Sequence, residues 1–267
     1  MNQAAIGIFD SGMGGLTVMR ALKSALPSEQ FIYLGDTARL PYGTKSATTV
    51  RRYAMQAAQA LALRGVKLIV VACNTASLAA RELAASLAPL PVLGVIEPGA
   101  AAALAVTPQG PIAVLATEGT VKEGAYARAI GGRATVLQQA CPLFVPLAEE
   151  GLIDGQITEL VVRRYLEPVL SQSPAPRTLL LGCTHYPVLR EVIRRIAGPE
   201  LAIVDSAQTT AAAVTELLRV RQLRADRNAP AAPRFLVTDA PERFARIGQV
   251  FFGEVIDPDQ VELIDLQ

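Results

Sequence analysis

Cys73 lies between the apolar run 67–72 and the polar residues Asn74 and Thr75. Short β-branched apolar runs are typical of strands that are buried on both faces in a parallel sheet. Residues 77–87 are helix formers at helical spacing, so we expect the thiol where a strand gives way to a helix. Ligands of open α/β sheets bind at such strand ends, and the dipole of a following helix stabilises a thiolate. Cys73 is therefore a candidate catalytic thiol.

A second stretch repeats this arrangement around Cys183. The apolar run 178–182 predicts a buried strand, Thr184 and His185 follow the cysteine, and residues 187–197 predict a helix with proline in its first turn. Two equivalent thiols at two equivalent strand ends suggest a pair of facing catalysts. A thiolate on one side of a carbon acid can remove its proton while a thiol on the other side donates one. Such chemistry inverts a stereocentre.

A two-thiol site must also stabilise a carbanion-like transition state. The first predicted strand leads into a glycine-rich turn at residues 11–15, whose backbone N–H groups are expected to form a nest for a carboxylate. The hydroxyls of Ser11, Thr75 and Thr184 are candidates for the same task. The turn is not the dinucleotide-binding G-x-G-x-x-G motif, which would need glycine in place of Thr17.

Other interpretations of the three cysteines stay open on the residues alone. Free cysteine is often a small buried hydrophobe, and we favour this interpretation for Cys141. A zinc site of three cysteines and the single histidine is numerically available, but structural zinc ligands usually come in close-spaced pairs, and only Cys183 and His185 are near in sequence. The chain has no C-x-x-C pair, which argues against a redox pair and a disulfide framework.

The composition favours an α/β protein with a small-molecule partner. The chain has 267 residues, of which 51% are hydrophobic, and 25 Lys+Arg against 24 Asp+Glu give a net charge of +1. This balance gives no sign of a nucleic-acid or anionic-membrane partner. The first residues lack a secretory signal, and prolines, a glutamate and a glycine interrupt the apolar segment 87–106. We therefore predict a cytoplasmic protein.

No cofactor or metal is expected. A pyridoxal enzyme needs a Schiff-base lysine, and the lysines, Lys23, Lys45, Lys67 and Lys122, have no distinctive context. Because Lys45 lies in a predicted loop, a pyridoxal enzyme that uses this lysine stays open as an alternative.

The order of the predicted elements indicates two α/β units. Strands and helices alternate over residues 6–96, the signature of a doubly wound sheet with right-handed crossovers. Residues 97–99, Glu-Pro-Gly, are expected to break this pattern at a domain hinge. A second series has predicted helices at 100–106, 121–130, 156–170 and 187–197 and strands at 112–116, 134–138, 178–182 and 201–204.

The C-terminal part is expected to return to the first domain. The Pro/Ala/Arg-rich tract 224–234 predicts a surface linker, followed by strand 235–238, helix 241–252 and strand 261–266. We therefore predict a discontinuous first domain of residues 1–97 plus 208–267 and a second domain of residues 98–207.

Six motifs in chain order resemble those of the bacterial glutamate racemases, in the cofactor-independent aspartate/glutamate racemase family. The motifs are IGIFDSGMGGLTV, YLGDTARLPYG, VVACNTAS, LATEGTVKEGAY, ACPLFVPLAEEG and LLGCTHYP. The resemblance covers essentially the whole chain and implies two pseudosymmetric α/β domains with the active site between them. It implies conversion of L-glutamate to D-glutamate for peptidoglycan synthesis without a cofactor. An aspartate racemase of the same family and a non-catalytic amino-acid-binding protein stay open, as does a homodimer.

The resemblance also implies roles for individual residues. The implied catalytic residues are Cys73, Cys183, Asp10, His185 and Glu150, in which the two cysteines are the acid/bases. Glu149 beside Glu150 is the alternative assistant. The implied substrate contacts are Asp10, Ser11, Pro41, Tyr42, Gly43, Asn74, Thr75, Thr117, Thr120, Thr184 and His185. From their positions in the sequence alone, Asp10 could also be a helix cap, and His185 could be a structural histidine whose hydrogen bonds are satisfied within the fold.

Overall fold

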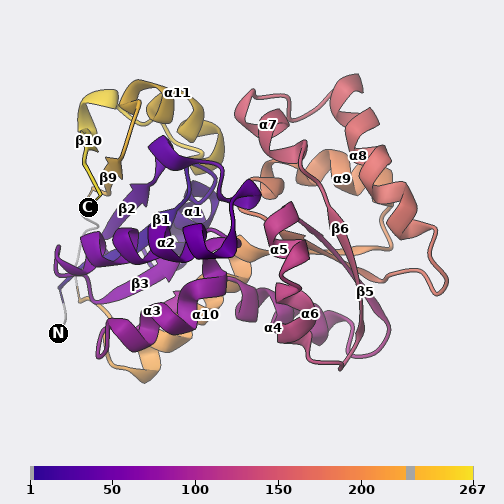
Figure 1. The fold of residues 1–267 in the computed structure, drawn as a ribbon, viewed down its shortest axis with the longest axis horizontal. Helices are drawn as coiled ribbons and strands as arrows, with labels where there is room; N and C mark the ends of the chain where they lie inside the picture. Colours follow the sequence, from indigo (N-terminus) through magenta and orange to yellow (C-terminus); the bar gives the residue numbers. More distant parts are fainter. Residues whose placement is uncertain (1–2, 227–231, 267) are drawn as a thin grey trace.

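Two parallel β-sheets lie side by side in the computed structural model of the chain, which describes residues 3–226 and 232–266 (Figure 1). The first sheet has the order β10-β9-β2-β1-β3-β4, and every neighbouring pair is parallel. Its strands are β1 (Ile6–Asp10), β2 (Phe31–Gly35), β3 (Leu68–Val71), β4 (Val92–Gly94), β9 (Arg234–Val237) and β10 (Val261–Leu263). The C-terminal strands thus complete the sheet that the N-terminal strands begin.

The second sheet has the order β6-β5-β7-β8 and is also entirely parallel. Its strands are β5 (Pro111–Ala116), β6 (Thr135–Ala140), β7 (Thr178–Gly182) and β8 (Ala202–Asp205). Strands β5 and β7 are buried along their whole length, as their continuous apolar sequences predict.

Helices cover both faces of each sheet. They are α1 (Leu16–Ala25), α2 (Ala47–Ala62), α3 (Ala80–Ser86), α4 (Ile96–Val106), α5 (Glu118–Lys122), α6 (Ala125–Ile130), α7 (Phe144–Glu149), α8 (Gln156–Leu170), α9 (Arg190–Ala197), α10 (Ser206–Val220) and α11 (Pro241–Phe252). Helices α1, α10 and α11 pack on one face of the first sheet and α2 and α3 on the other. Helices α8 and α9 cover one face of the second sheet, and α4 and α6 the other. The predicted fold class, two doubly wound α/β units, is confirmed.

Several local details differ from the predictions; for example, the predicted helix 121–130 is two helices, α5 and α6, and α7 was not expected. Glu97, Pro98 and Gly99 lie inside α4 rather than at a break, because a proline in the first turn of a helix removes no intrahelical hydrogen bond. Helix α10 was not expected. It begins where the Asp205 side chain accepts hydrogen bonds from two backbone N–H groups, and its apolar face packs in the same core as α1. The residues after Cys73 form a 3₁₀ helix, Ala76–Ala79, before α3 begins.

Two further expectations concern regions outside these elements. The tract 224–234, expected to be a linker, lies partly outside the described residues. The boundaries of the two domains stay a prediction, although the sheets divide the chain in the same sense. None of the helices in the described part of the chain combines the length and apolar composition that crossing a bilayer requires.

Candidate active site

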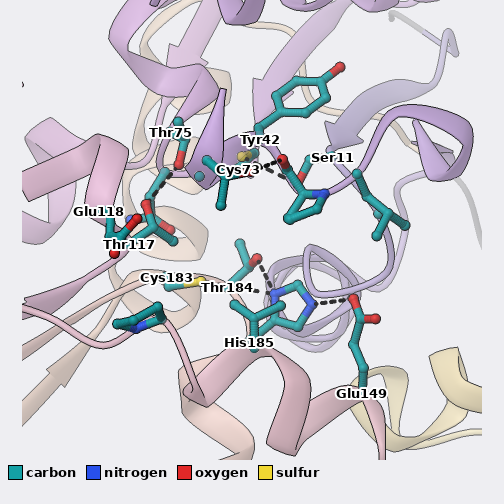
Figure 2. A pocket seen from close by; sticks show the side chains of 18 residues that line it. Ser11, Tyr42, Cys73, Thr75, Thr117, Glu118, Glu149, Cys183, Thr184 and His185 are labelled. Carbon is teal, nitrogen blue, oxygen red and sulfur yellow. Dashed lines mark hydrogen bonds and ion pairs between the residues drawn. The ribbon is translucent and has the colours of Figure 1, made fainter. Parts of the chain in front are cut away.

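Both thiols line one pocket at the carboxyl ends of the two sheets. Cys73 lies beyond the end of β3 and Cys183 directly beyond the end of β7, and Figure 2 shows them on opposite sides of the pocket. The pocket is lined by Ser11, Gly12, Leu40, Pro41, Tyr42, Gly43, Thr44, Cys73, Asn74, Thr75, Thr117, Glu118, Pro142, Val145, Glu149, Cys183, Thr184 and His185. Most of the residues expected at the site are therefore brought together from distant parts of the chain.

Cys73 is a deeply buried thiol, with 6% of its surface exposed. Its sulfur lies 3.7 Å from the Ser11 hydroxyl oxygen, and the backbone N–H of Ala76 donates to it over 3.4 Å. Burial raises the pKa of Cys73 to about 12, and the neighbouring Asp10 carboxyl acts in the same direction, against these two hydrogen bonds. The expected stabilisation of a thiolate by a following helix is therefore outweighed here by desolvation. Cys73 is a thiol at neutral pH.

Cys183 has a different electrostatic environment because a histidine lies beside it. The Nδ1 atom of His185 is 3.9 Å from the Cys183 sulfur, and its Nε2 atom is 3.3 Å from Oε1 of Glu149. Burial alone would lower the pKa of His185, but its contacts with Cys183 and Glu149 and the nearby Asp10 raise it to about 10. His185 is thus a cation at neutral pH and holds positive charge next to the second sulfur.

The glycine-rich turn after β1 is folded around Asp10. The fully buried carboxylate accepts a hydrogen bond from Gly12 N over 3.0 Å, and Thr184 Oγ1 donates to its other oxygen over 3.4 Å. Burial raises the pKa of Asp10, while His185 and the turn's N–H groups oppose this shift. Gly14 has no room for a side chain, since a Cβ there would lie 2.3 Å from the histidine ring. Asp10 thus supports the pocket wall from behind instead of lining it.

Hydroxyl groups form a cluster at the other end of the pocket. The Thr75 hydroxyl lies 3.0 Å from that of Thr117 and 3.3 Å from that of Thr120, so the end of the first sheet meets the start of α5. Thr120 is completely buried behind the two lining threonines. Beside the cluster, Asn74 donates through Nδ2 to the Tyr126 hydroxyl over 2.7 Å. Its Oδ1 atom is buried and has no partner among the described residues.

The loop before α2 forms a further wall. Tyr42 donates a short hydrogen bond through its hydroxyl to Asp36, which also accepts from Arg39 Nε over 2.8 Å. This network anchors the loop that carries Pro41 and Gly43 to the pocket. A Cβ on Gly43 would lie 2.8 Å from Thr117 Cβ, so the absence of a side chain allows the loop to approach α5.

The structure corrects the position of one expected assistant. Glu150, at the C-terminal cap of α7, is exposed and does not line the pocket, whereas Glu149 lines it and contacts His185. Burial would raise the pKa of Glu149, but hydrogen bonds from His185 and from Arg243, 3.3 Å away, lower it. Of the two candidate assistants, Glu149, the alternative to Glu150, is therefore the one that lies beside the histidine.

The other unexpected lining residues are mostly next to expected ones or inside quoted motifs. They are Gly12, Leu40, Thr44, Glu118, Pro142 and Val145. The sequence motifs contained this signal, since Glu118 follows Thr117 directly and Val145 lies four residues before Glu149. No lysine is among the lining residues, and within the described ranges no group of three or more His, Cys, Asp or Glu side chains is arranged to hold a metal ion.

Comparison with known proteins confirms the resemblance carried by the motifs. The model of the Asp/Glu/hydantoin racemase family matches residues 6–214. The glutamate racemase of Geobacter metallireducens is 49% identical, with 93% of each chain covered. The crystal structure of the Thermus thermophilus glutamate racemase in complex with β-chloro-D-alanine is 43% identical, with a TM-score of 0.88 and coverage of 99% of this chain and 98% of that one. The crystal structure of the Francisella tularensis glutamate racemase in complex with D-glutamate is 36% identical. Its TM-score is 0.90, with coverage of 100% of this chain and 99% of that one. With this agreement in sequence, fold and pocket, the chain belongs to the Asp/Glu/hydantoin racemase family.

Proposed function

We propose that this protein interconverts L- and D-glutamate, with Cys73 and Cys183 as the two acid/base catalysts. The observation that carries the proposal is the pair of thiols on opposite sides of one pocket, at equivalent strand ends. The relatives that match along nearly the whole chain are glutamate racemases, and one of the similar structures contains D-glutamate. Both findings support glutamate as the substrate.

The unequal surroundings of the two thiols suit one proton acceptor and one proton donor, and the family resemblance assigns the acceptor for L-glutamate to Cys183. The Cys183 sulfur, beside cationic His185, acts as the thiolate that removes the Cα proton from one side. Cys73, held as a thiol by burial, donates its proton to the other side of the carbanion. The product is D-glutamate, Cys183 is now a thiol and Cys73 a thiolate. Conversion of D-glutamate runs the same two transfers in reverse.

The groups around the thiols suit the charged parts of an amino acid. The unpartnered Oδ1 of Asn74 is an acceptor for an ammonium group, whose hydrogen bond would remove the cost of a buried unsatisfied oxygen. The hydroxyls of Thr75 and Thr117 are donors for carboxylates. Donors that face the developing negative charge lower the barrier to proton removal.

The cellular proposal follows from this reaction. We propose that the protein works without a cofactor, in the cytoplasm, and supplies D-glutamate for peptidoglycan synthesis, with the small-molecule substrate as its partner and no requirement for a nucleic acid or a membrane. Formation of a homodimer and the domain division at residues 97/98 and 207/208 stay proposals of the same rank. The similarity to glutamate racemases supports the proposed racemisation, and the two separate sheets support the proposed division into two domains.

Deuterium incorporation tests the proposed reaction. Purified protein incubated with L-glutamate in D₂O is expected to yield glutamate of both configurations with deuterium at Cα, detected by proton NMR and chiral chromatography. L-Aspartate is run in parallel. Exchange with aspartate but not glutamate would favour an aspartate racemase, and exchange with neither, at substrate concentrations that bind, would favour a non-catalytic binding protein.

A further inference from the structure

The C-terminal helix α11 contacts the histidine site although it belongs to the other sheet. It packs through Phe244, Ile247 and Phe251 into the core of the first sheet. His185 and Glu149, in contrast, come from elements that follow β7 and β6 of the second sheet. Figure 1 shows α11 above the first sheet, on the side facing α7. Helix α11 is therefore fixed on one sheet and faces residues carried by the other.

Two side chains of α11 make these contacts. Arg243 Nη2 lies 3.3 Å from Oε2 of Glu149. Phe251, eight residues further along the same helix, packs its ring edge-on against His185, with the ring centroids 5.1 Å apart at an angle of 74°. Residues spaced by about two helical turns lie on one face of a helix. A single face of α11 therefore contacts both Glu149 and His185.

The Glu149 carboxylate divides its two oxygens between two cations. Oε1 lies 3.3 Å from His185 Nε2, and Oε2 binds Arg243. Glu149 is the last residue of the six-residue helix α7. The arginine therefore supplies the second point that fixes the plane and rotamer of the carboxylate.

We infer that Arg243 is a positioning residue for the proposed racemisation: by holding one oxygen of Glu149, it keeps the other directed at His185, and through His185 it orients the group beside Cys183. This inference rests on the proposed function. It extends the site to a helix that contributes no residue to the pocket lining. The exposed fraction of the Arg243 side chain is 40%, so solvent weakens its ion pair with Glu149. Its main contribution is therefore to hold the Glu149 carboxylate in position.

The single histidine of the chain makes a direct test available. Protein labelled with ¹³C-histidine gives one titrating ring, and the titratable groups facing it are Cys183, Glu149 and Asp10. With wild-type protein the ring is expected to titrate with a pKa of about 10. In R243Q the loosened carboxylate supports the imidazolium less, so the pKa of His185 is expected to fall. A purely electrostatic neighbour gives the opposite sign, because removal of a nearby cation makes protonation easier.

Activity gives a second readout. R243Q is expected to lower kcat/KM for glutamate roughly tenfold to a hundredfold, the scale on which a small misplacement acts. Because the equilibrium constant of racemisation is one, the loss must be equal from L- and D-glutamate, which checks the assay. R243K, which keeps a cation, is expected to lie between R243Q and the wild type. R246Q, at an exposed position one turn further along α11, serves as the matched control and is expected to match the wild type.

A double-mutant cycle separates positioning from general stability. If Arg243 acts through Glu149, R243Q combined with E149Q is expected to be no less active than E149Q alone. Additive losses would overturn the inference, as would a His185 pKa that stays constant or rises in folded R243Q. If R243Q does not fold, R243K takes its place, and the activity of R243K/E149Q is compared with that of E149Q alone. The titration needs no turnover, so a wild-type protein inactive on glutamate would remove the proposed function without deciding the test of Arg243.

Discussion

The side chain of Thr17 binds the backbone of the residue that follows Cys183. Its hydroxyl oxygen lies 2.9 Å from the carbonyl oxygen of Thr184 and 2.9 Å from that of Gly14. Thr17 lies in α1, which packs on the first sheet, whereas Thr184 follows β7 of the second. One buried hydroxyl therefore joins the glycine-rich turn to the segment that carries a proposed catalyst.

Replacement of this hydroxyl tests its contribution. T17V keeps the shape but removes the hydroxyl that donates to the Thr184 carbonyl, whereas the Gly14 carbonyl still accepts from the backbone N–H of residue 17; we expect the free energy of unfolding to fall by about 1–3 kcal/mol. The measurement is urea denaturation followed by circular dichroism at pH 7. T17S retains the hydroxyl and serves as the control. Equal stability of T17V and the wild type would show that the Thr184 carbonyl finds another donor.

Gly14 is expected to tolerate no side chain. In G14A the new Cβ would lie 2.3 Å from Nδ1 of His185 and 2.6 Å from Oγ1 of Thr184, so the histidine must move away from Cys183. We expect a loss of racemase activity of roughly a hundredfold, with a folded protein by circular dichroism. The control is G99A in α4, where the nearest atom is at 3.4 Å. Full activity of G14A would mean that the position of His185 does not limit the reaction.

The two cysteines are expected to fail in different ways. C73S and C183S should each abolish racemisation, because a hydroxyl is far too weak an acid to supply a comparable base at neutral pH. Each variant keeps one thiol and is expected to retain traces of Cα exchange, C73S from L-glutamate and C183S from D-glutamate. The measurement is deuterium exchange from each pure enantiomer. Wild-type turnover in either variant would contradict the two-base mechanism, and reversed preferences would overturn only the assignment of sides.

The protonation of His185 predicts a pH dependence of stability. Folding raises its pKa from 6.5 to about 10, so its stabilising effect is complete below pH 6.5 and is lost as pH rises towards 10. The difference in free energy of unfolding between the wild type and H185N is therefore expected to shrink across this range. Denaturant titrations at pH 6, 8 and 10 provide the measurement. A difference that stays constant with pH would place the histidine pKa outside this window.

Strongly patterned elements were predictable from the sequence. Strand β7, helix α8 and helix α11 have the predicted bounds, because each has a continuous apolar run or a clear helical period ended by proline, glycine or polar residues. The two cysteines share a pocket as predicted: each follows the carboxyl end of a parallel strand, where ligands of such sheets bind, and the pocket is lined from both sheets.

Features that depend on tertiary contacts were not predictable. Glu149 and Glu150 are adjacent on a short helix, and the choice between them depends on how α7 packs near His185 and Arg243. Helix α10 is rich in alanine and threonine, and its role is evident only from its packing beside α1. The raised pKa of Cys73 depends on how deeply the folded chain buries it, which local sequence does not encode.

The order of the strands also has a consequence for synthesis on the ribosome. All strands of the second sheet lie within residues 111–205, so this sheet can pair while the rest of the chain is still being made. The first sheet must wait for β9 and β10. Strand β2 has an unpaired edge that other chains can join until residues 234–237 pair with it as β9, and β9 has such an edge until residues 261–263 pair with it as β10. A nascent chain that is stalled or truncated before residues 234–237 therefore exposes the edge of β2, where it can pair with other chains.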